Sequence, residues 1–398
     1  MEPSKAAYSE EKEIQPAFTE LCEVASIGSN GSILFATDDF FAPAEGMLKD
    51  SDPVFRADLY TPYGKWMDGW ETRRKRIAGH DWCLVELGAP AQIAGFVIDT
   101  AFFTGNYPPQ LSISAGTLDD TAKEMLLAAI PRKSGIDGEE SIGKGCTQEE
   151  LDMVNQLGTD RWENLLPIRQ CRVDLKPGYE QTRRHYFSVP ASEQSRVVRH
   201  LRVNLFPDGG IARLRVHGTI KLNMSDDLNA QQTIDVVAKQ NGGLCTGYSN
   251  AHYGHPKNLI KATEAANMGF GWETARRLDR PHELKLDEDN GFLMSQGSEW
   301  ATFKLAGGMC TIERLCIDTK HFKGNFPDCV WADYTLDPCA DSENWQPLLR
   351  RKKLGPDQMH VFEGEDLKQG VQASKVRITI APDGGIARLR IFGKVLRS

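Results

Sequence analysis

The residues best suited to acid–base chemistry are two glutamates that each follow a tryptophan in a repeated phrase. The phrase is DGWETRR over 68–74 and GWETARR over 271–277. A carboxyl group buried beside an indole is poorly hydrated, and this raises its pKa and suits it to donate a proton near neutral pH. Glu71 and Glu273 are therefore candidate general acids. The alternative is that each forms an ion pair with an arginine of its own phrase and only fixes a loop.

A second repeated phrase could hold an anion. It is FPDGGIARLRVHG over 206–218 and APDGGIARLRIFG over 381–393. In a β-strand, Arg213 and Arg215 would project from the same face, about 7 Å apart. Two guanidinium groups could bind a carboxylate, or they could pair with acidic groups on a neighbouring strand. The occurrence of the phrase in both halves favours a scaffold, since one active site needs only one copy.

Four more residues near these phrases could take part in chemistry. Asp39, in DDFFAPAE, is either a general base or the cap of a helix that starts nearby. His80, in GHDW, could transfer protons, although a hydrogen-bonded structural position is more common for such a histidine. Asn106, in GNYP, is more typical of a turn than of a ligand contact. Arg73 begins RRKR, a run more typical of a solvated surface.

Both phrases belong to a duplication that runs through the chain. Asp208 matches Asp383, an offset of 383 − 208 = 175, and VIDTAFFTGNYP (97–108) matches CIDTKHFKGNFP (316–327). The period is too long for a solenoid, so each copy must be its own domain. We expect a mobile tail over 1–28, a first repeat over 29–220, a connector over 221–241 and a second repeat over 242–398.

The secondary structure that must position these residues is mainly β. Short β-branched runs are bounded by Gly, Pro and Asp, as is typical of strands. Pro-Asp-Gly-Gly is turn chemistry, and we expect it to form a hairpin that closes each sandwich. The best helical stretches, 121–130 and 258–268, are minor. The sequence predicts an all-β fold of two tandem jelly-roll β-sandwich domains, with a polar, partly helical insertion in the first copy.

Composition narrows the class of function. The 398 residues carry 47 Lys+Arg against 55 Asp+Glu, a net charge of −8, so a nucleic-acid partner is not expected. No apolar run approaches the length of a membrane span, and no membrane partner is expected. Nine cysteines without a C-x-x-C pair indicate reduced thiols and a cytoplasmic location.

A metal or cofactor is not expected from the sequence. His252 and His255 lie three residues apart in HYGHP, but no acidic or cysteine partner follows at a spacing known for zinc. The phrases also contain no signature of a covalent serine or cysteine nucleophile. We therefore expect no metal and no cofactor.

These phrases together resemble one family, the allantoicases. The resemblance rests on ATDDFFAPAE, KWMDGWETRRKR, FFTGNYPP, FPDGGIARLRVHG, HPKNLI and GWETARR, and it spans nearly the whole chain. It implies hydrolysis of allantoate to ureidoglycolate and urea in purine breakdown. It also implies two jelly-roll domains that resemble galactose-binding modules, and assembly into a homo-oligomer.

The implied reaction needs a cation for the substrate carboxylate, an acid for the departing nitrogen and a base for water. The proposed catalytic residues are Asp39, Glu71 and His80, and the proposed substrate-binding residues are Arg73, Asn106, Arg213 and Arg215. The copies differ at DDFFAPAE, where the second copy has NAHYGHPK, so their contributions to a site should be unequal. The alternatives are a non-catalytic module that binds a small ligand and a regulatory descendant of the enzyme.

Overall fold

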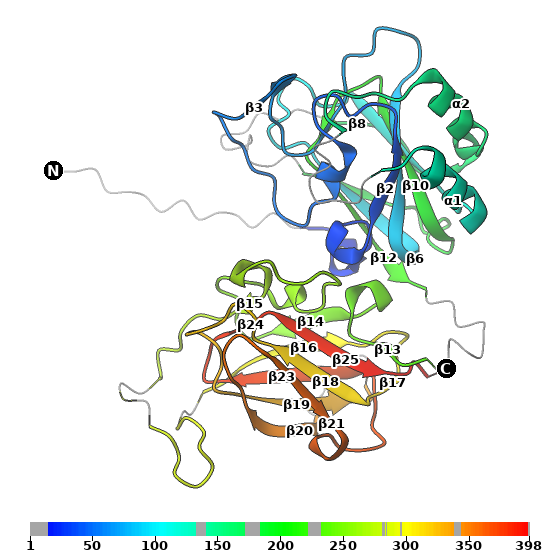
Figure 1. The fold of residues 1–398 in the computed structure, drawn as a ribbon. Coiled ribbons are helices and arrows are strands. Elements are labelled where there is room, and N and C mark those ends of the chain that lie inside the picture. The colour runs from blue at the N-terminus through cyan, green and yellow to red at the C-terminus, as the bar shows by residue number, and fades with distance from the viewer. Residues whose placement is uncertain are drawn as a thin grey trace, which may run out of the picture.

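The protein is described by a computed structural model that covers residues 15–132, 141–171, 184–221, 232–280, 283, 285–294, 297–337 and 344–396. Two β-rich domains lie one above the other (Figure 1). No helix among the described residues is long and apolar enough to cross a membrane. None of the cysteines in these ranges forms a disulfide, in agreement with the expected reduced thiols.

The first domain is organised around one long strand, β6 (Asp81–Asp99). The first half of β6 pairs with β2 and β10, and its second half pairs with β12 and β9, so a single strand belongs to both layers of the sandwich. The other strands follow in the order β1-β12-β6-β10-β7-β8. Their bounds are β1 Cys22–Glu23, β2 Ser32–Ala36, β7 Gln110–Gly116, β8 Glu163–Gln170, β9 Arg184–Ser188, β10 Val197–Phe206 and β12 Arg213–Ile220.

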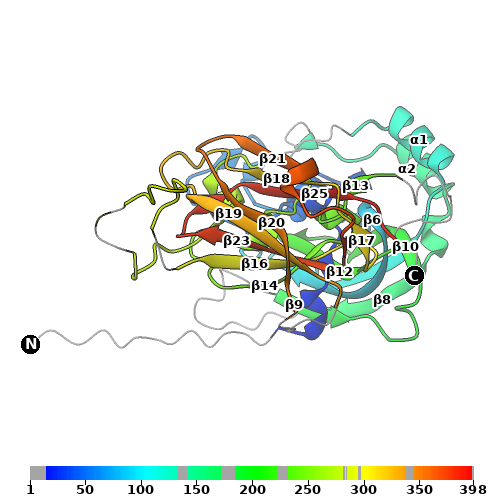
Figure 2. The same ribbon diagram turned by 90° about the horizontal axis from the view of Figure 1, so that it is seen from below.

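The second domain repeats this topology with the long strand divided in two. One sheet has the order β14-β16-β23-β19-β20 and the other has the order β13-β25-β18-β21, and β16 and β18 together correspond to β6. Figure 2 shows these two layers from below. The strands are β13 Ile234–Asp235, β14 Leu244–Tyr248, β16 Glu299–Lys304, β18 Arg314–Asp318, β19 Cys329–Thr335, β20 Gln346–Lys353, β21 Met359–Glu363, β23 Lys375–Ala381 and β25 Arg388–Gly393. The all-β tandem sandwich and its origin by duplication are thus confirmed.

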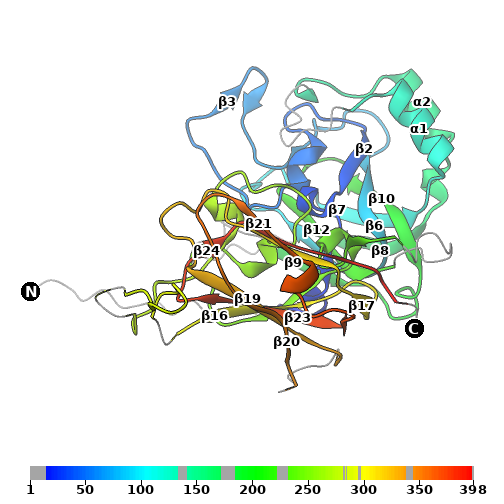
Figure 3. The same cartoon turned by 60° about the horizontal axis from the view of Figure 1, so that its bottom comes forward.

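Four short strand pairs form separate two-stranded sheets, and two of these pairs contain residues of the repeated phrases. Trp70–Glu71 (β5) pairs with Gly210–Ile211 (β11), and Trp272–Glu273 (β15) pairs with Gly385–Ile386 (β24). The pair β3–β4 projects from the first domain (Figure 3). The remaining bounds are β3 Tyr60–Thr61, β4 Gly64–Lys65, β17 Cys310–Thr311 and β22 Gln372–Ala373.

The repeated tryptophans anchor equivalent cores. Trp70 and Trp272 are both fully buried. Each indole Nε1 donates a hydrogen bond of 2.8 Å to a backbone carbonyl, that of Asp38 in the first domain and that of Asn250 in the second. The WET phrase is therefore fixed to the core by its tryptophan, and this fixes the position of the glutamate that follows.

The insertion in the first copy forms two helices on the outer side of the first domain (Figure 1). Helix α1 (Asp120–Ala129) begins after Asp119, whose side chain accepts from the Ala122 N–H, and α2 (Gln148–Asn155) begins with a capping box. Leu126 and Val154 on these helices pack against the β-sheet residue Trp82. The 3₁₀ turns are η1 Ala17–Glu20, η2 Ile27–Ser29, η3 Ala44–Leu48, η5 Thr159–Arg161, η7 Lys239–Asn241, η8 Pro256–Asn258, η9 Met268–Phe270 and η10 Gly364–Asp366.

The helix expected over 258–268 is not present. The segment contains only the ends of η8 and η9. The backbone carbonyls of Lys261 and Thr263, which an α-helix would use for its own hydrogen bonds, instead accept from Arg390 at 2.7 Å and from Arg388 at 2.7 Å. The arginines of the repeated phrase therefore hold this segment in an open conformation.

The Pro-Asp-Gly-Gly turn is an arch between sheets and not the expected hairpin. Strands β10 and β12 both pair with β6 but not with each other, and β23 and β25 lie in different sheets. The arch forms because the residues after the turn pair with β5 or β15, which draws the chain across to the other layer. At Gly209, φ is +140° and a Cβ atom would lie 2.4 Å from the backbone nitrogen of Pro108, so the arch requires glycine.

The domain ends differ from the expected boundaries. Residues 17–28 were expected in a tail but contain η1, β1 and the start of η2, and β1 pairs with β12. The expected connector overlaps β13 and η7, which belong to the second domain. The short strands β1 and β13 were missed because two residues are too few to show a β periodicity.

Candidate active site at a duplicated glutamate–asparagine pair

The two candidate acids occupy equivalent positions and have equivalent partners. Nδ2 of Asn106 donates to Oε1 of Glu71 at 2.6 Å, and Nδ2 of Asn325 donates to Oε1 of Glu273 at 2.6 Å. In each domain the glutamate ends the short strand β5 or β15, and the asparagine lies in the GN loop that follows β6 or β18. The alternative expected from the sequence, an ion pair with an arginine of the same phrase, is not what the structure contains.

Backbone hydrogen bonds to the carbonyl groups of the glutamate and the asparagine fix the position of the pair in each domain. The Glu273 carbonyl accepts from the N–H groups of His252 at 3.1 Å and Tyr253 at 3.2 Å, and the Asn325 carbonyl accepts from Gly385 N–H at 2.8 Å. In the first domain the Glu71 carbonyl likewise accepts from two successive N–H groups, those of Phe41 and Ala42, which are one residue further along the aligned phrase, and the Asn106 carbonyl accepts from Gly210 N–H. The arch of the PDGG phrase therefore supports the loop that carries the asparagine, and this explains why the phrase occurs in both copies.

The glutamates remain available for proton transfer. Oε2 of Glu71 and Oε2 of Glu273 have no hydrogen-bond partner among the described residues. Burial raises the pKa of Glu71, although the amide of Asn106 and the charge of Arg74 act in the opposite direction. A carboxyl group with one oxygen free of hydrogen bonds can exchange a proton with a bound molecule, and the raised pKa of Glu71 favours its role as a proton donor.

The second domain has a cavity of about 430 Å³ at its pair. Arg276 lines this cavity, is exposed, and forms no ion pair or hydrogen bond with any other described residue. Arg276 has no acidic partner because Asp383, the counterpart of Asp208, is bound by Nη1 of Arg280 at 3.0 Å. In the first domain, the equivalent of Arg276 is Arg74, and its guanidinium is held by Asp208 at 3.1 Å. The remaining lining side chains include His252, Tyr253, Glu273 and Asn325.

Aromatic side chains take the place of the imidazole in the first domain. Phe40, which corresponds to His252, packs against Phe41 and Tyr63 with ring centroids 5.1 and 5.0 Å apart. Arg73 stacks over Phe40 at 4.7 Å and forms an ion pair of 2.7 Å with Asp38. The expected inequality of the copies is therefore a difference in polarity, because the second-domain cavity combines an unpaired cation, a carboxylate and an imidazole.

Asp39 lies outside this arrangement in a buried ion-pair network. Its Oδ2 is 2.9 Å from Nη1 of Arg132, and Arg132 also bonds to both carboxylate oxygens of Glu45 at 2.8 Å. Its Oδ1 accepts from Ala44 N–H, the first residue of η3, at 2.9 Å. Burial raises the pKa of Asp39 even though Arg132 lowers it. The carboxylate is engaged on both sides, which fits the capping alternative better than a general base.

His80 is likewise separate from the pair. Its Nε2 is 3.0 Å from Oδ1 of Asn204 on β10, and its ring lies 4.5 Å from that of Phe206. Burial lowers the pKa of His80. The structure does not bring His80 to Glu71, Asn106 or Arg73 by any hydrogen bond, and its contacts are those of a structural residue.

Arg213, which was predicted to bind substrate, is engaged by groups of the protein itself. Its guanidinium bonds to Asp68 at 2.7 Å and donates to backbone carbonyls that include those of Ser51 at 2.8 Å and Asp68 at 3.1 Å. Arg215 donates to the carbonyl of Lys49 at 2.5 Å. Both arginines support the segment 46–52 and lie on the side of the domain that faces its neighbour. The sequence could not show this because the partners are main-chain atoms distant in the chain.

Arg276 was not among the predicted binding residues. The duplication contains the information that could have identified it, since Arg280 lies where the first copy has Ala78 at the same offset of 276 − 74 = 202. Within the described ranges, no group of three or more His, Cys, Asp or Glu side chains could hold a metal ion.

A family model and a named relative both place the chain in one family. A family model described as Allantoicase repeat matches residues 22–221 and again 234–396. A protein named "Probable allantoicase" from Acinetobacter baumannii (strain SDF) is 36% identical over 397 residues, which is 96% of this chain and 98% of that protein.

Solved structures agree with this result. A crystal structure of allantoicase from Saccharomyces cerevisiae has a TM-score of 0.65 at 27% identity, covering 93% of this chain and 92% of its own. A second structure, entitled "Structure of allantoicase", has a TM-score of 0.66 at 26% identity and covers 94% of this chain and 93% of its own.

Proposed function

The chain belongs to the allantoicase family, and on that premise we propose that it hydrolyses allantoate to ureidoglycolate and urea. The family resemblance extends over both domains. The observation that supports the site is the glutamate–asparagine pair beside an unpaired arginine in a cavity of about 430 Å³. A cavity of this size is sufficient for a small diureide acid.

Each group in the cavity matches a need of the substrate. Arg276 offers a planar guanidinium to the carboxylate of allantoate, a geometry that permits two parallel hydrogen bonds. Oε2 of Glu273 is free to accept from a ureido N–H or from water, and Asn325 keeps the carboxylate in one orientation. Glu71 and Asn106 form the matching pair of the first domain, and the raised pKa of Glu71 suits a proton donor.

The reaction consumes one water and needs no redox partner. Glu273 takes a proton from water as the water oxygen forms a bond to the central carbon, and the carbon–nitrogen bond to one ureido group breaks. The proton returns to the departing nitrogen, which leaves as urea, and the hydroxyl stays on the carbon as ureidoglycolate. A positioned carboxyl group contributes about 10²–10⁴-fold to such a proton transfer.

The test is the kinetics of urea release by Glu273→Gln. Glutamine keeps the hydrogen-bonding shape but cannot accept and return a proton, so kcat should fall by at least about 100-fold while the melting temperature is kept. The same substitution in the first domain, Glu71→Gln, measures how far that pair takes part. Wild-type turnover in both folded variants would place the chemistry elsewhere, and no urea release by folded wild-type protein would favour a non-catalytic descendant.

We also propose that the chain forms a homo-oligomer, as the family resemblance implies. The segment over 54–63 supports this, because Phe55 is 52% exposed and Tyr60 is 66% exposed. Exposed apolar groups that cluster in one segment often mark a contact between subunits. Light scattering of the purified protein, which gives the mass directly, tests the proposal.

A further inference from the structure

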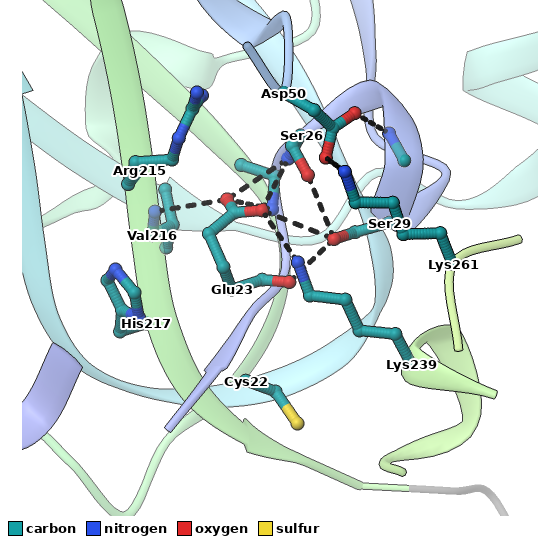
Figure 4. Close-up of polar contacts among 12 residues, drawn as sticks. Cys22, Glu23, Ser26, Ser29, Asp50, Arg215, Val216, His217, Lys239 and Lys261 are labelled. Carbon is teal, nitrogen blue, oxygen red and sulfur yellow. Dashed lines mark hydrogen bonds and ion pairs between the residues drawn. The ribbon is translucent and has the colours of Figure 1, made fainter. Parts of the chain in front are cut away.

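A second cavity, of about 470 Å³, lies between the two domains. Figure 4 shows part of its lining, with Glu23, Asp50, Arg215, His217, Lys239 and Lys261 labelled. The first domain contributes Glu23, Asp50, Arg215 and His217 among others, and the second contributes Lys239, His255, Lys257 and Lys261. Neither glutamate–asparagine pair lines this cavity, so it is distinct from the site described above.

Two ion pairs span the boundary between the domains and engage the carboxylates of Glu23 and Asp50. The other carboxylates that line the cavity, Asp52 and Asp99, pair with Arg184 at 3.0 and 3.3 Å. Lys239 lies 3.3 Å from Glu23, and Lys261 lies 3.5 Å from Asp50. Glu23 also accepts from the backbone N–H groups of Ala25 at 2.9 Å and Ser26 at 3.0 Å. Each carboxylate oxygen of Glu23 and Asp50 thus has at least one partner, and the dashed lines of Figure 4 mark these contacts.

Arg215 forms no ion pair with a carboxylate of the described residues, whereas its counterpart in the second domain does. Its counterpart there is Arg390, and Nε of Arg390 lies 3.4 Å from the carboxylate of Asp235 on β13. Glu23, on the equivalent strand β1, has Lys239 as its partner instead, and no carboxylate oxygen among the described residues lies within 4.0 Å of Arg215. The guanidinium of Arg215 donates only to the backbone carbonyls of Leu214 and Lys49.

The second domain adds donors to the same cavity. The ammonium group of Lys257 has no ion pair or hydrogen bond with another described residue. Nδ1 of His255 accepts from the backbone N–H of Lys257 at 3.1 Å, so its neutral ring carries the proton on Nε2 and can donate it. His217 has the opposite tautomer, because its Nδ1 is 3.2 Å from the carbonyl of Leu21, and its Nε2 is left as an acceptor.

We propose that the cavity between the domains is a second binding site, for a small organic carboxylate that also carries a hydroxyl or N–H donor. The carboxylate binds Arg215 of the first domain together with Lys257 of the second. Nε2 of His217 accepts from the donor group of the ligand. Because cations of both domains hold one ligand, its binding stabilises the contact between the domains.

The test uses malate as the probe and its uncharged diamide, malamide, as the control ligand. Titration calorimetry and thermal unfolding are measured on the full chain, on Arg215→Met and on Lys257→Met. Malate should bind the wild type and raise its melting temperature in a concentration-dependent manner, and each substitution should weaken binding by about tenfold or more. Lys257 is exposed, so its variant will fold even if the Arg215 variant is unstable.

Lys323→Met is the matched control, since Lys323 is also exposed but does not line the cavity. It should bind malate with wild-type affinity. The proposal is overturned if malate does not bind the wild type, if Lys257→Met binds as tightly as Lys323→Met, or if malamide binds as well as malate. Equal binding of sulfate through the same residues would overturn the assignment to an organic carboxylate. None of these readouts depends on turnover of allantoate.

Discussion

Nδ2 of Asn325 lies 2.6 Å from Oε1 of Glu273 and joins two loops that are 52 residues apart in the chain. The first domain has the same bond at the same length. The arginines around the two pairs differ in their partners, but the pairs themselves do not. Each repeat therefore positions the same glutamate–asparagine pair. The side chains around the pair differ between the two domains, and these differences determine what each domain can bind.

Removal of the amide should impair turnover without unfolding the domain. In Asn325→Ala the carboxylate of Glu273 loses the group that fixes its orientation, and we expect kcat/KM for allantoate to fall by about 10–100-fold. The Asn325 side chain bonds to Glu273 and, at 3.5 Å, to the sulfur of Met268, so little stability is lost. Urea release and a melting curve check this. Unchanged kinetics in a folded variant would contradict a positioning role.

Acid should weaken the first domain through Glu23. Burial alone would raise the pKa of Glu23, but the charges of Lys239 and Arg215 and the Ser26 hydrogen bond outweigh it and lower the pKa to about 2 from 4.5. A folded-state pKa below the unfolded value stabilises the protein above about pH 4.5, and this stabilisation disappears as the pH falls towards 2. Its size is about 3 kcal/mol. Calorimetry between pH 2 and 5 should show this loss in the wild type and a smaller one in Glu23→Gln.

Asp235→Asn is the control for that measurement. Asp235 occupies the equivalent strand, but burial raises its pKa despite the backbone bond from Ile391 and the charge of Arg390. Ionisation of Asp235 therefore costs stability as the pH rises, and its removal should not reduce the sensitivity to acid. Equal pH dependence of the Glu23→Gln variant and the wild type would show that the contact with Lys239 contributes nothing.

The repeated phrases predicted the fold because an offset between two copies shows which strands must correspond. The offset between the WET phrases aligns Trp70 with Trp272, and both indoles are fully buried. It did not predict the arch after Asp208, because Pro-Asp-Gly-Gly has the same local chemistry in a hairpin and in a crossing between sheets. The choice depends on pairing with β5, which is a long-range interaction.

The sequence analysis could choose candidate residues of the site but could not predict which groups each of them contacts. Glu71 and Asn106 were chosen separately from the sequence and lie together. Arg213 was also chosen, but it bonds to main-chain carbonyls, and no pattern of side-chain types reveals such acceptors. Arg276 is free of Asp383 because Arg280 binds that carboxylate. The duplication shows the extra arginine at position 280, but only the structure shows that it is the one that binds Asp383.

The helices of the insertion should contribute to the stability of the first domain. Leu126 of α1 is 2% exposed and belongs to the cluster around Trp82, whereas its neighbour Met125 is 68% exposed. Leu126→Ala should therefore lower the free energy of unfolding by about 2–5 kcal/mol, because it leaves a cavity under the helix. Met125→Ala should change it by less than about 0.5 kcal/mol. Urea unfolding followed by tryptophan fluorescence measures both, and equal effects would mean that α1 is not packed against the sheet.

The two arginines that begin the last strand of each domain should differ in their importance for stability. Arg213 forms a buried ion pair with Asp68, and both side chains are at most 5% exposed. Arg213→Met would leave that carboxylate with only the more distant Lys49 at 3.3 Å as a cation. The loss of one partner of a buried pair costs about 3–5 kcal/mol, so the first domain should melt at a markedly lower temperature.

Arg388 is the counterpart of Arg213, and it has carbonyl partners only. It donates to Thr263 at 2.7 Å and to Phe270 at 2.7 Å, while its Nη2 is buried and has no hydrogen-bond partner. Arg388→Met therefore leaves unsatisfied carbonyls but no unpaired carboxylate, at a cost of about 1–3 kcal/mol. Scanning calorimetry, which resolves the two domains if they melt separately, should show the larger shift for Arg213→Met. The opposite order would mean that the carbonyl contacts, and not the ion pair with Asp68, hold the repeated phrase in place.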